Sequence, residues 1–257
     1  IKAWIESMEN LSELGMKVIC YNFMPILDWT RTELAAPMSS GATAMYFDLL
    51  DFIAFDCFIL ERMNAQNDYE KKLVDKAKHR FEEFSKEKKL TLTKNITAGL
   101  PGASEKLTFQ EVKRRLESYS GIDAHKLREN FKYFLDAVVP TAEKMGVRLC
   151  CHPDDPPWPL LGLPRIMSSE EDYNWLVNIY PSKANGITLC TGSLGTSFEN
   201  DLPGMVSRLG KHIHFLHLRN VTREQESIPT SFYEDEHLSG HTDMIETISE
   251  IIREENR

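Results

Sequence analysis

Apolar residues recur at helical spacing at the start of the chain and then give way to a short apolar run. In residues 2–14 the apolar positions repeat every three to four residues, which predicts a helix with one buried face. Gly15 follows as a helix-stop signal. The next run, MKVICYN at 16–22, is rich in β-branched and apolar residues and predicts a strand buried on both faces. The chain is therefore expected to open with a helix followed by a buried strand.

The same order of helix and strand recurs three more times. Apolar runs typical of buried strands lie at 147–152, 186–190 and 213–219. Helical patterns precede them, most clearly at 127–145 and 170–180. Repeated alternation of helix and strand is typical of α/β proteins with a parallel sheet. We therefore predict an α/β fold whose sheet is either open or closed into a barrel.

Charged residues dominate the segment between about 61 and 126. Its pattern, as in EKKLVDKAKHRFEEFSKEKK, predicts helices with a solvent-exposed face, interrupted by a turn at the sequence GLPG, 99–102. Apolar strand runs lie on both sides of this segment, so it resembles an insertion. We predict a single domain over residues 1–257 that carries a mainly helical insertion at about 61–126.

Composition narrows the range of partners. The 257 residues carry a formal charge of -9, which disfavours binding to the phosphates of a nucleic acid. No apolar run approaches the roughly 20 residues that a membrane helix requires. Five cysteines without the spacing of a disulfide framework favour a reducing compartment, so we predict a cytoplasmic protein. A small molecule is the expected partner, and a homo-oligomer stays compatible with the sequence.

The four predicted strands end on residues that can carry chemistry. Functional side chains of a parallel barrel gather at the carboxyl ends of its strands. The strands here end on Asn22, His152, Cys190 and His217, and Arg219 follows the last of them. The three metal-type residues are 38 and 27 positions apart, close to the roughly 31 residues per unit of a 250-residue barrel. Neighbouring strands would therefore bring two imidazoles and a thiolate together, a set that suits Zn²⁺, Fe²⁺ or Mn²⁺.

Each of these residues also has a purely structural explanation. A single strand histidine is usually a hydrogen-bonded core group, and a single cysteine is commonly a small buried apolar residue. Three metal-type residues at successive strand ends favour a metal site over these alternatives. His214 shares the last strand with His217, but the two-residue period predicts that it faces the opposite side.

Several motifs, in the same order along the chain, resemble the mannonate dehydratase family. They are CYNFMPILDWTRT (20–32), NITAGLPGA (95–103), LRENF (127–131), HPDDPP (152–157), GLPRI (162–166), CTGS (190–193) and HLRN (217–220). The match runs essentially from end to end, and HPDDPP followed by GLPRI is highly specific. The resemblance implies a TIM-type (β/α)8 barrel of the xylose-isomerase-like kind. It also implies a hydro-lyase that uses Mn²⁺ or Fe²⁺ to dehydrate D-mannonate to 2-keto-3-deoxy-D-gluconate in hexuronate (glucuronate) breakdown.

The resemblance also assigns roles to residues. It places the family's first histidine ligand on His152, its cysteine ligand on Cys190 and its second histidine ligand on His217. The family normally continues into an Arg-Pro-Asp-His-Gly segment with the fourth metal ligand and the catalytic base, and that segment is not in this sequence. We therefore expect the first and last barrel elements, the fourth ligand and the base to lie outside these 257 residues.

Three polar residues at or beyond strand ends are predicted to bind the sugar acid. Asn22, Arg31 and Arg219 would orient its carboxylate and hydroxyl groups. Two of them have an alternative structural role, because Arg31 could instead pair with Asp28 and Arg219 could cap the strand end.

Other functions stay open at this point. A sugar isomerase or epimerase of the same barrel class would use the same metal platform on a different sugar. An incomplete barrel without activity is a second alternative. A metal-dependent enzyme that cleaves nucleic acid is disfavoured by the negative charge.

Overall fold

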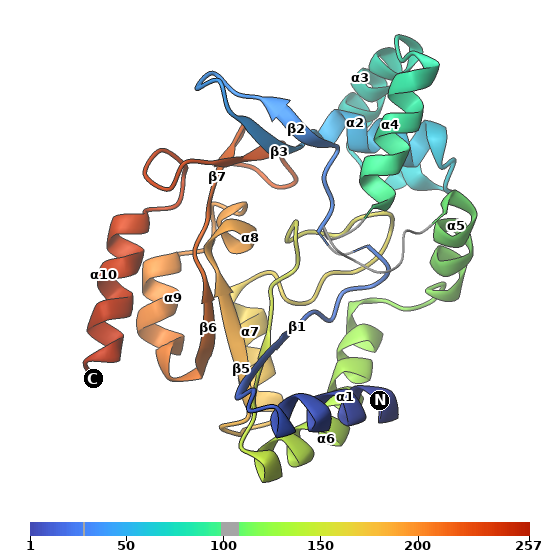
Figure 1. The fold of residues 1–257 in the computed structure, drawn as a ribbon. Helices are drawn as coiled ribbons and strands as arrows, with labels where there is room; N and C mark the ends of the chain where they lie inside the picture. Colours follow the sequence, from blue (N-terminus) through green and yellow to red (C-terminus); the bar gives the residue numbers. More distant parts are fainter. Residues whose placement is uncertain (28, 99–107) are drawn as a thin grey trace.

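A parallel four-stranded sheet forms the centre of the computed structural model, which describes residues 1–27, 29–98 and 108–257. Its strands are β1 (Val18–Tyr21), β4 (Arg148–Cys151), β5 (Asn185–Cys190) and β6 (Ile213–His217). The strand order is β1-β4-β5-β6, and all neighbours are parallel (Figure 1). The four apolar runs therefore predict the strands correctly, and the α/β fold with a parallel sheet is confirmed. Among the described residues the sheet is an open half-barrel with β1 and β6 at its edges.

Helices cover the outer face of this sheet. They are α1 (Lys2–Glu13), α6 (Ala124–Met145), α7 (Glu170–Ile179), α9 (Leu202–Leu209) and α10 (Met244–Glu255) (Figure 1). The apolar core between helices and sheet receives alternate strand residues such as Leu149 and Cys151 of β4 and Leu189 of β5. Because side chains alternate along a strand, His152 and Cys190 lie on the opposite, inner face.

Local sequence explains where the longest helix, α6, begins and ends. The Asp123 side chain caps its first turn by accepting a hydrogen bond from the backbone N–H of Lys126 at 2.7 Å. Phe131 and Leu135, four residues apart, are fully buried against the sheet. Gly146 adopts the left-handed conformation (φ 63°) that ends the helix, and β4 begins two residues later.

A β-bulge changes which side chains of β6 reach the inner face. The register of β5 with β6 shifts by one residue between Ile187 and Thr188, so β6 contains one extra residue there. The ring of His214 consequently lies against Gly186, where an added Cβ would be 2.3 Å from the His214 Cε1 atom. Gly186 shares the inner face with Thr188, two residues along β5. The prediction that His214 and His217 face opposite sides is therefore wrong, because the bulge interrupts the two-residue alternation.

A second sheet, which is not among the predicted elements, lies beyond the carboxyl ends of the parallel strands (Figure 1). It is antiparallel, has the order β2-β3-β8-β7, and consists of β2 (Glu33–Pro37), β3 (Thr43–Phe47), β7 (Asn220–Arg223) and β8 (Phe232–Asp235). Strands β2 and β3 follow β1 in the chain, and β7 and β8 follow β6. The segments that leave the two edge strands of the first sheet therefore combine into the second.

Helices occupy most of the charged middle segment and the residues just before it. They are α2 (Leu49–Ala54), η1 (Phe55–Ile59), η2 (Ala65–Asp68), α3 (Lys71–Glu82), α4 (Lys86–Thr97) and α5 (Phe109–Ser118). They surround a second apolar core that includes Phe47 of β3, Phe52 of α2 and Phe232 of β8. The turn predicted at 99–102 lies outside the described residues. The division into one domain with an insertion at 61–126 stays a prediction.

Candidate metal centre

His152, Cys190 and His217 come together at the carboxyl ends of three neighbouring strands. His152 directly follows β4, while Cys190 and His217 are the last residues of β5 and β6 and pair with each other in register. One ligand atom from each residue lies within 4.8 Å of the other two. Cys190 is buried, His152 is half-buried and His217 is exposed, so the group is accessible from one side.

The spacing of the ligand atoms fits a single metal ion. His152 Nε2 lies 3.2 Å from His217 Nδ1, and Cys190 Sγ lies 3.5 Å from the same nitrogen. Nitrogen and sulfur ligands of a tetrahedral ion, at about 2.1 and 2.3 Å from it, are about 3.3–3.6 Å apart. Within the described ranges, no fourth histidine, cysteine or carboxylate joins this group.

Neighbouring groups orient the ligands. His152 Nδ1 donates a hydrogen bond to the Pro153 carbonyl at 2.8 Å, which turns Nε2 toward the other two ligand atoms. Cys190 caps the short helix α8 (Thr191–Gly195), and its Sγ accepts a hydrogen bond from the backbone N–H of Ser193 at 3.4 Å. Both contacts leave the ligand atoms facing the centre of the group.

The charges around the ligands favour a thiolate beside an imidazolium. Burial alone would raise the pKa of Cys190, but Arg219 and hydrogen bonds from the two histidines hold it well below its usual value. Burial alone would lower the pKa of His152, but its hydrogen bond with Cys190 and the negative charge there raise the pKa to about 9. The site therefore stabilises the deprotonated sulfur that a metal ligand requires.

Four charged side chains form a closed arginine–carboxylate network beside the candidate metal ligands. Arg31 donates to Asp155 Oδ1 and to Glu234 Oε1, at 2.7 Å each. Arg219 donates to the same two carboxylates, at 2.6 Å for Glu234 Oε2. The side chains of Arg31 and Asp155 are 0% and 1% exposed, and those of Arg219 and Glu234 are 16% and 18% exposed. Two positive and two negative charges thus balance within a largely water-excluded region.

Ser193 connects this network to the candidate metal ligands. Its hydroxyl group donates to Asp155 Oδ2 at 2.9 Å and accepts from Arg219 at 2.9 Å. Its backbone N–H donates to Cys190 Sγ. The preceding Gly192 leaves room for the guanidinium, since an added Cβ would lie 2.5 Å from the Arg219 side chain. The network therefore holds a positive charge next to the thiolate.

The three residues predicted to bind substrate occupy different environments. Asn22 follows β1 and is exposed, and Arg219 reaches the surface with part of its side chain. Arg31 is fully buried, and its partners are Asp155 and Glu234. The alternative partner, Asp28, lies outside the described residues. Substrate contact by all three stays a prediction, and the burial of Arg31 favours an indirect role.

Sequence reasoning missed three residues that surround the ligands. Asp155 follows His152 by three positions in HPDDPP, and Ser193 follows Cys190 by three in CTGS, so proximity to a predicted ligand is a usable signal for both. The neighbouring Asp154 has a structural role. Its Oδ2 accepts hydrogen bonds from the backbone N–H groups of Ile166 and Met167 and so stabilises the loop that follows β4. Glu234 has no such signal, since only the second sheet brings it to the site.

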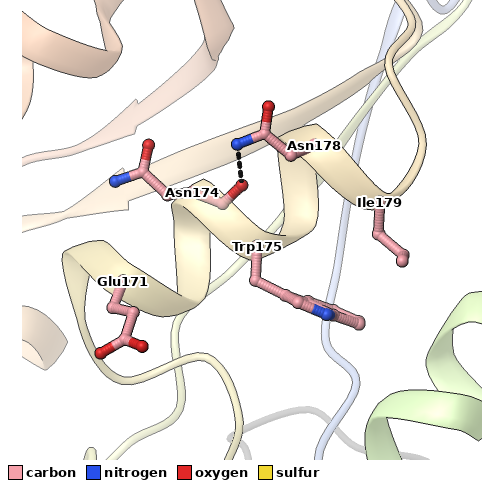
Figure 2. Close-up of a pocket in the computed structure, with 5 residues that line it drawn as sticks. All are labelled: Glu171, Asn174, Trp175, Asn178 and Ile179. Carbon is pink, nitrogen blue, oxygen red and sulfur yellow. Dashed lines mark hydrogen bonds between the residues drawn. The ribbon is translucent and has the colours of Figure 1, made fainter.

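A separate depression lies on the surface of α7 (Figure 2). It is lined by Glu171, Asn174, Trp175, Asn178 and Ile179. The Asn178 side chain donates to the Asn174 backbone carbonyl at 2.7 Å, so that amide is already used within the helix. This depression is shallow and gathers none of the predicted ligands, so we assign no chemistry to it.

Comparison with known proteins identifies the family. The family model for D-mannonate dehydratase (UxuA) matches residues 1–257. The chain belongs to the D-mannonate dehydratase family. It is 49% identical over 254 residues to mannonate dehydratase of Rhizobium meliloti and 50% identical over 257 residues to mannonate dehydratase 1 of Agrobacterium fabrum. These matches cover 99% and 100% of this chain but 63% and 64% of the relatives, so the chain spans a little under two thirds of their length.

A solved structure from the same family has a similar fold. The crystal structure of mannonate dehydratase from Streptococcus suis serotype 2 matches with a TM-score of 0.70 and 30% identity. The match covers 99% of this chain and 59% of that one. The family resemblance inferred from the sequence motifs is confirmed, and the parallel α/β arrangement is shared with the D-mannonate dehydratase structure.

Proposed function

We propose that this chain provides the metal site of a hydro-lyase that dehydrates D-mannonate to 2-keto-3-deoxy-D-gluconate in hexuronate breakdown. The observation that carries the proposal is the convergence of His152, Cys190 and His217 at strand ends, in a chain of the D-mannonate dehydratase family. Relatives at 49% and 50% identity that bear the name mannonate dehydratase support the choice of reaction.

These three residues would hold Mn²⁺ or Fe²⁺. The distances between their ligand atoms and the stabilised thiolate both fit a borderline divalent ion. When bound, such an ion acts as a Lewis acid that stabilises the negative charge developing as the C2 proton of the sugar acid is removed. The fourth ligand and the base that the resemblance implies stay predictions.

Residues of this chain would bind and orient the sugar acid. Arg219 lies beside Cys190 and is partly exposed, so its guanidinium is suited to the substrate carboxylate. Asn22 is exposed at the end of β1, where its amide can hydrogen-bond to a hydroxyl group. Arg31 would act indirectly by fixing Asp155 and Glu234, which in turn position Arg219.

We further propose that the half-barrel belongs to a TIM-type (β/α)8 barrel of the xylose-isomerase-like kind. Four parallel strands in sequential order, helices on the outer face and ligands at the carboxyl ends support this classification.

We also propose that the reaction takes place in the cytoplasm. All five cysteines are free thiols, which supports a reducing compartment. In the part of the chain that the structure describes, no helix has the length and apolar character to cross a membrane.

Full-length protein, stripped of metal and then resupplied with Mn²⁺ and D-mannonate, tests the proposal. We expect the wild type and the control Cys57→Ser, which changes a thiol on η1, to form 2-keto-3-deoxy-D-gluconate only when Mn²⁺ is present. Cys190→Ser should form none and should bind Mn²⁺ at least about 100-fold more weakly, since even groups that only orient a ligand are worth about 10–100-fold. Folded, metal-loaded protein that leaves D-mannonate unchanged, or converts it to an isomer, would contradict the proposed dehydration.

A further inference from the structure

A second pair of sulfur atoms lies one layer below the candidate metal centre. Cys20 of β1 and Cys150 of β4 are paired in register in the parallel sheet. Their neighbours Tyr21 and Leu149 belong to the outer apolar core, so both cysteines face the inner side. Cys150 precedes His152 by two residues on the same face of its strand. The two thiols therefore form a layer of the inner face directly beneath a predicted metal ligand.

Each of the two sulfur atoms reaches toward a neighbouring strand. Cys150 Sγ donates to the Ile19 carbonyl on the neighbouring strand at 3.5 Å, and Cys20 Sγ lies 3.2 Å from Thr188 Oγ1. Thr188 lies on β5, on the far side of β4 from β1, so the Cys20 sulfur points across β4 while the Cys150 sulfur points back toward β1.

The strand geometry permits a covalent bond between them. Neighbouring strands are about 4.8 Å apart, which lies within the Cα separations of about 4.4–6.8 Å found across disulfides. Cys20 is exposed, while Cys150 is fully buried. In the described part of the chain Cys20 is therefore the more accessible thiol, so we expect the oxidant to react with it first, and Cys150 is positioned to react with it afterwards.

We propose that Cys20 and Cys150 form a peroxide-sensitive dithiol that closes to a disulfide. The Cys20 sulfur attacks one oxygen of hydrogen peroxide and breaks the O–O bond, which gives a sulfenic acid, and the second oxygen leaves as water with the thiol proton. The Cys150 sulfur then attacks the Cys20 sulfur, the S–S bond forms, and the sulfenic oxygen leaves as a second water. Two thiols thus lose two electrons and two protons, and one peroxide is reduced to two waters.

The remaining cysteines have different surroundings. Cys151 faces the outer apolar core, and Cys190 is held among the metal ligands. Cys57 lies on η1, in the part of the chain around the second core. The proposal does not depend on the enzymatic activity, because the disulfide is defined by the thiols alone.

Peptide mass spectrometry after peroxide treatment and thiol alkylation tests the proposal. We expect a linked pair of peptides containing Cys20 and Cys150, lighter than their sum by two hydrogens, and a loss of two of the five free thiols that dithiothreitol reverses. Cys20→Ser and Cys150→Ser should each abolish the linked peptide, whereas Cys57→Ser should retain it. Circular dichroism confirms that each variant is folded, and Cys20→Ser alone suffices if the buried substitution is not tolerated. Recovery of Cys20 as a sulfinic acid without a link, or linkage of Cys20 to a different cysteine, would overturn the proposal.

Discussion

Replacing Arg31 with leucine is the sharpest test of the arginine–carboxylate network. The fully buried guanidinium donates to Asp155 and to Glu234 at 2.7 Å each, and it lies 4.7 Å from the centre of the Phe232 ring. Its removal leaves two carboxylates facing Arg219 alone. Removing one partner of a buried ion pair costs about 3–5 kcal/mol. Because Glu234 keeps 18% exposure and water can partly solvate it, we expect the free energy of unfolding to fall by about 3 kcal/mol, the lower end of that range.

Thermal unfolding followed by circular dichroism measures this loss. For a protein of about 250 residues, 1 kcal/mol corresponds to about 2–4 °C, so the Tm of Arg31→Leu should fall by about 6–12 °C. Arg208→Leu is the matched control, because Arg208 also forms two hydrogen bonds to one carboxylate, Glu170, but is half exposed. Its loss should cost no more than about 1 kcal/mol. Equal Tm shifts in the two variants would refute the reasoning, since burial would then make no difference to the value of the ion pairs.

Three further predictions follow from local contacts. Gly186→Ala should lower the free energy of unfolding in urea by about 1–3 kcal/mol, because the new Cβ would meet the His214 ring at 2.3 Å, and His214→Ala should recover part of that loss. Asp123→Ala removes the cap of α6 and should cost about 1 kcal/mol in the same assay; no loss would contradict the capping role. Burial alone would raise the pKa of Asp155, but the two arginines of the network hold it below its usual value. Its contribution to stability is therefore complete above about pH 4 and is lost as the pH falls through the lower native pKa, so unfolding of Asp155→Asn should depend less on pH in acid. Equal acid slopes for wild type and variant would contradict the assigned pKa shift.

The two middle strands of the central sheet could be predicted because they are buried on both faces, β5 at every position and β4 at all but its first. A strand of this kind needs apolar residues at nearly every position, and that requirement leaves a continuous run in the sequence. The predicted runs 147–152 and 186–190 accordingly agree with β4 and β5 to within one residue at each end. The positions of His152 and Cys190 could be predicted for the same reason, since each residue lies at the end of one of these strands.

The second sheet has no comparable signal. Its strands are four or five residues long and mix buried with half-buried or exposed positions, as in the pattern of Glu33–Pro37. Strand β3 pairs with β8, so residues near 47 meet residues near 232. Such pairing depends on where the first sheet positions the two segments in space, and no local sequence pattern indicates it.

The arginine–carboxylate network shows why this missing sheet matters for the site. Asp155 follows β4 and Arg219 follows β6, so the parallel sheet alone brings these two together. Glu234 reaches them only from β8, and it accepts hydrogen bonds from both Arg31 and Arg219. Without Glu234 the two guanidiniums would share a single carboxylate in a buried region, which is unfavourable because one positive charge would lack a partner. The charge next to the candidate metal ligands is therefore balanced by a residue from the second sheet, which makes that sheet a part of the candidate site.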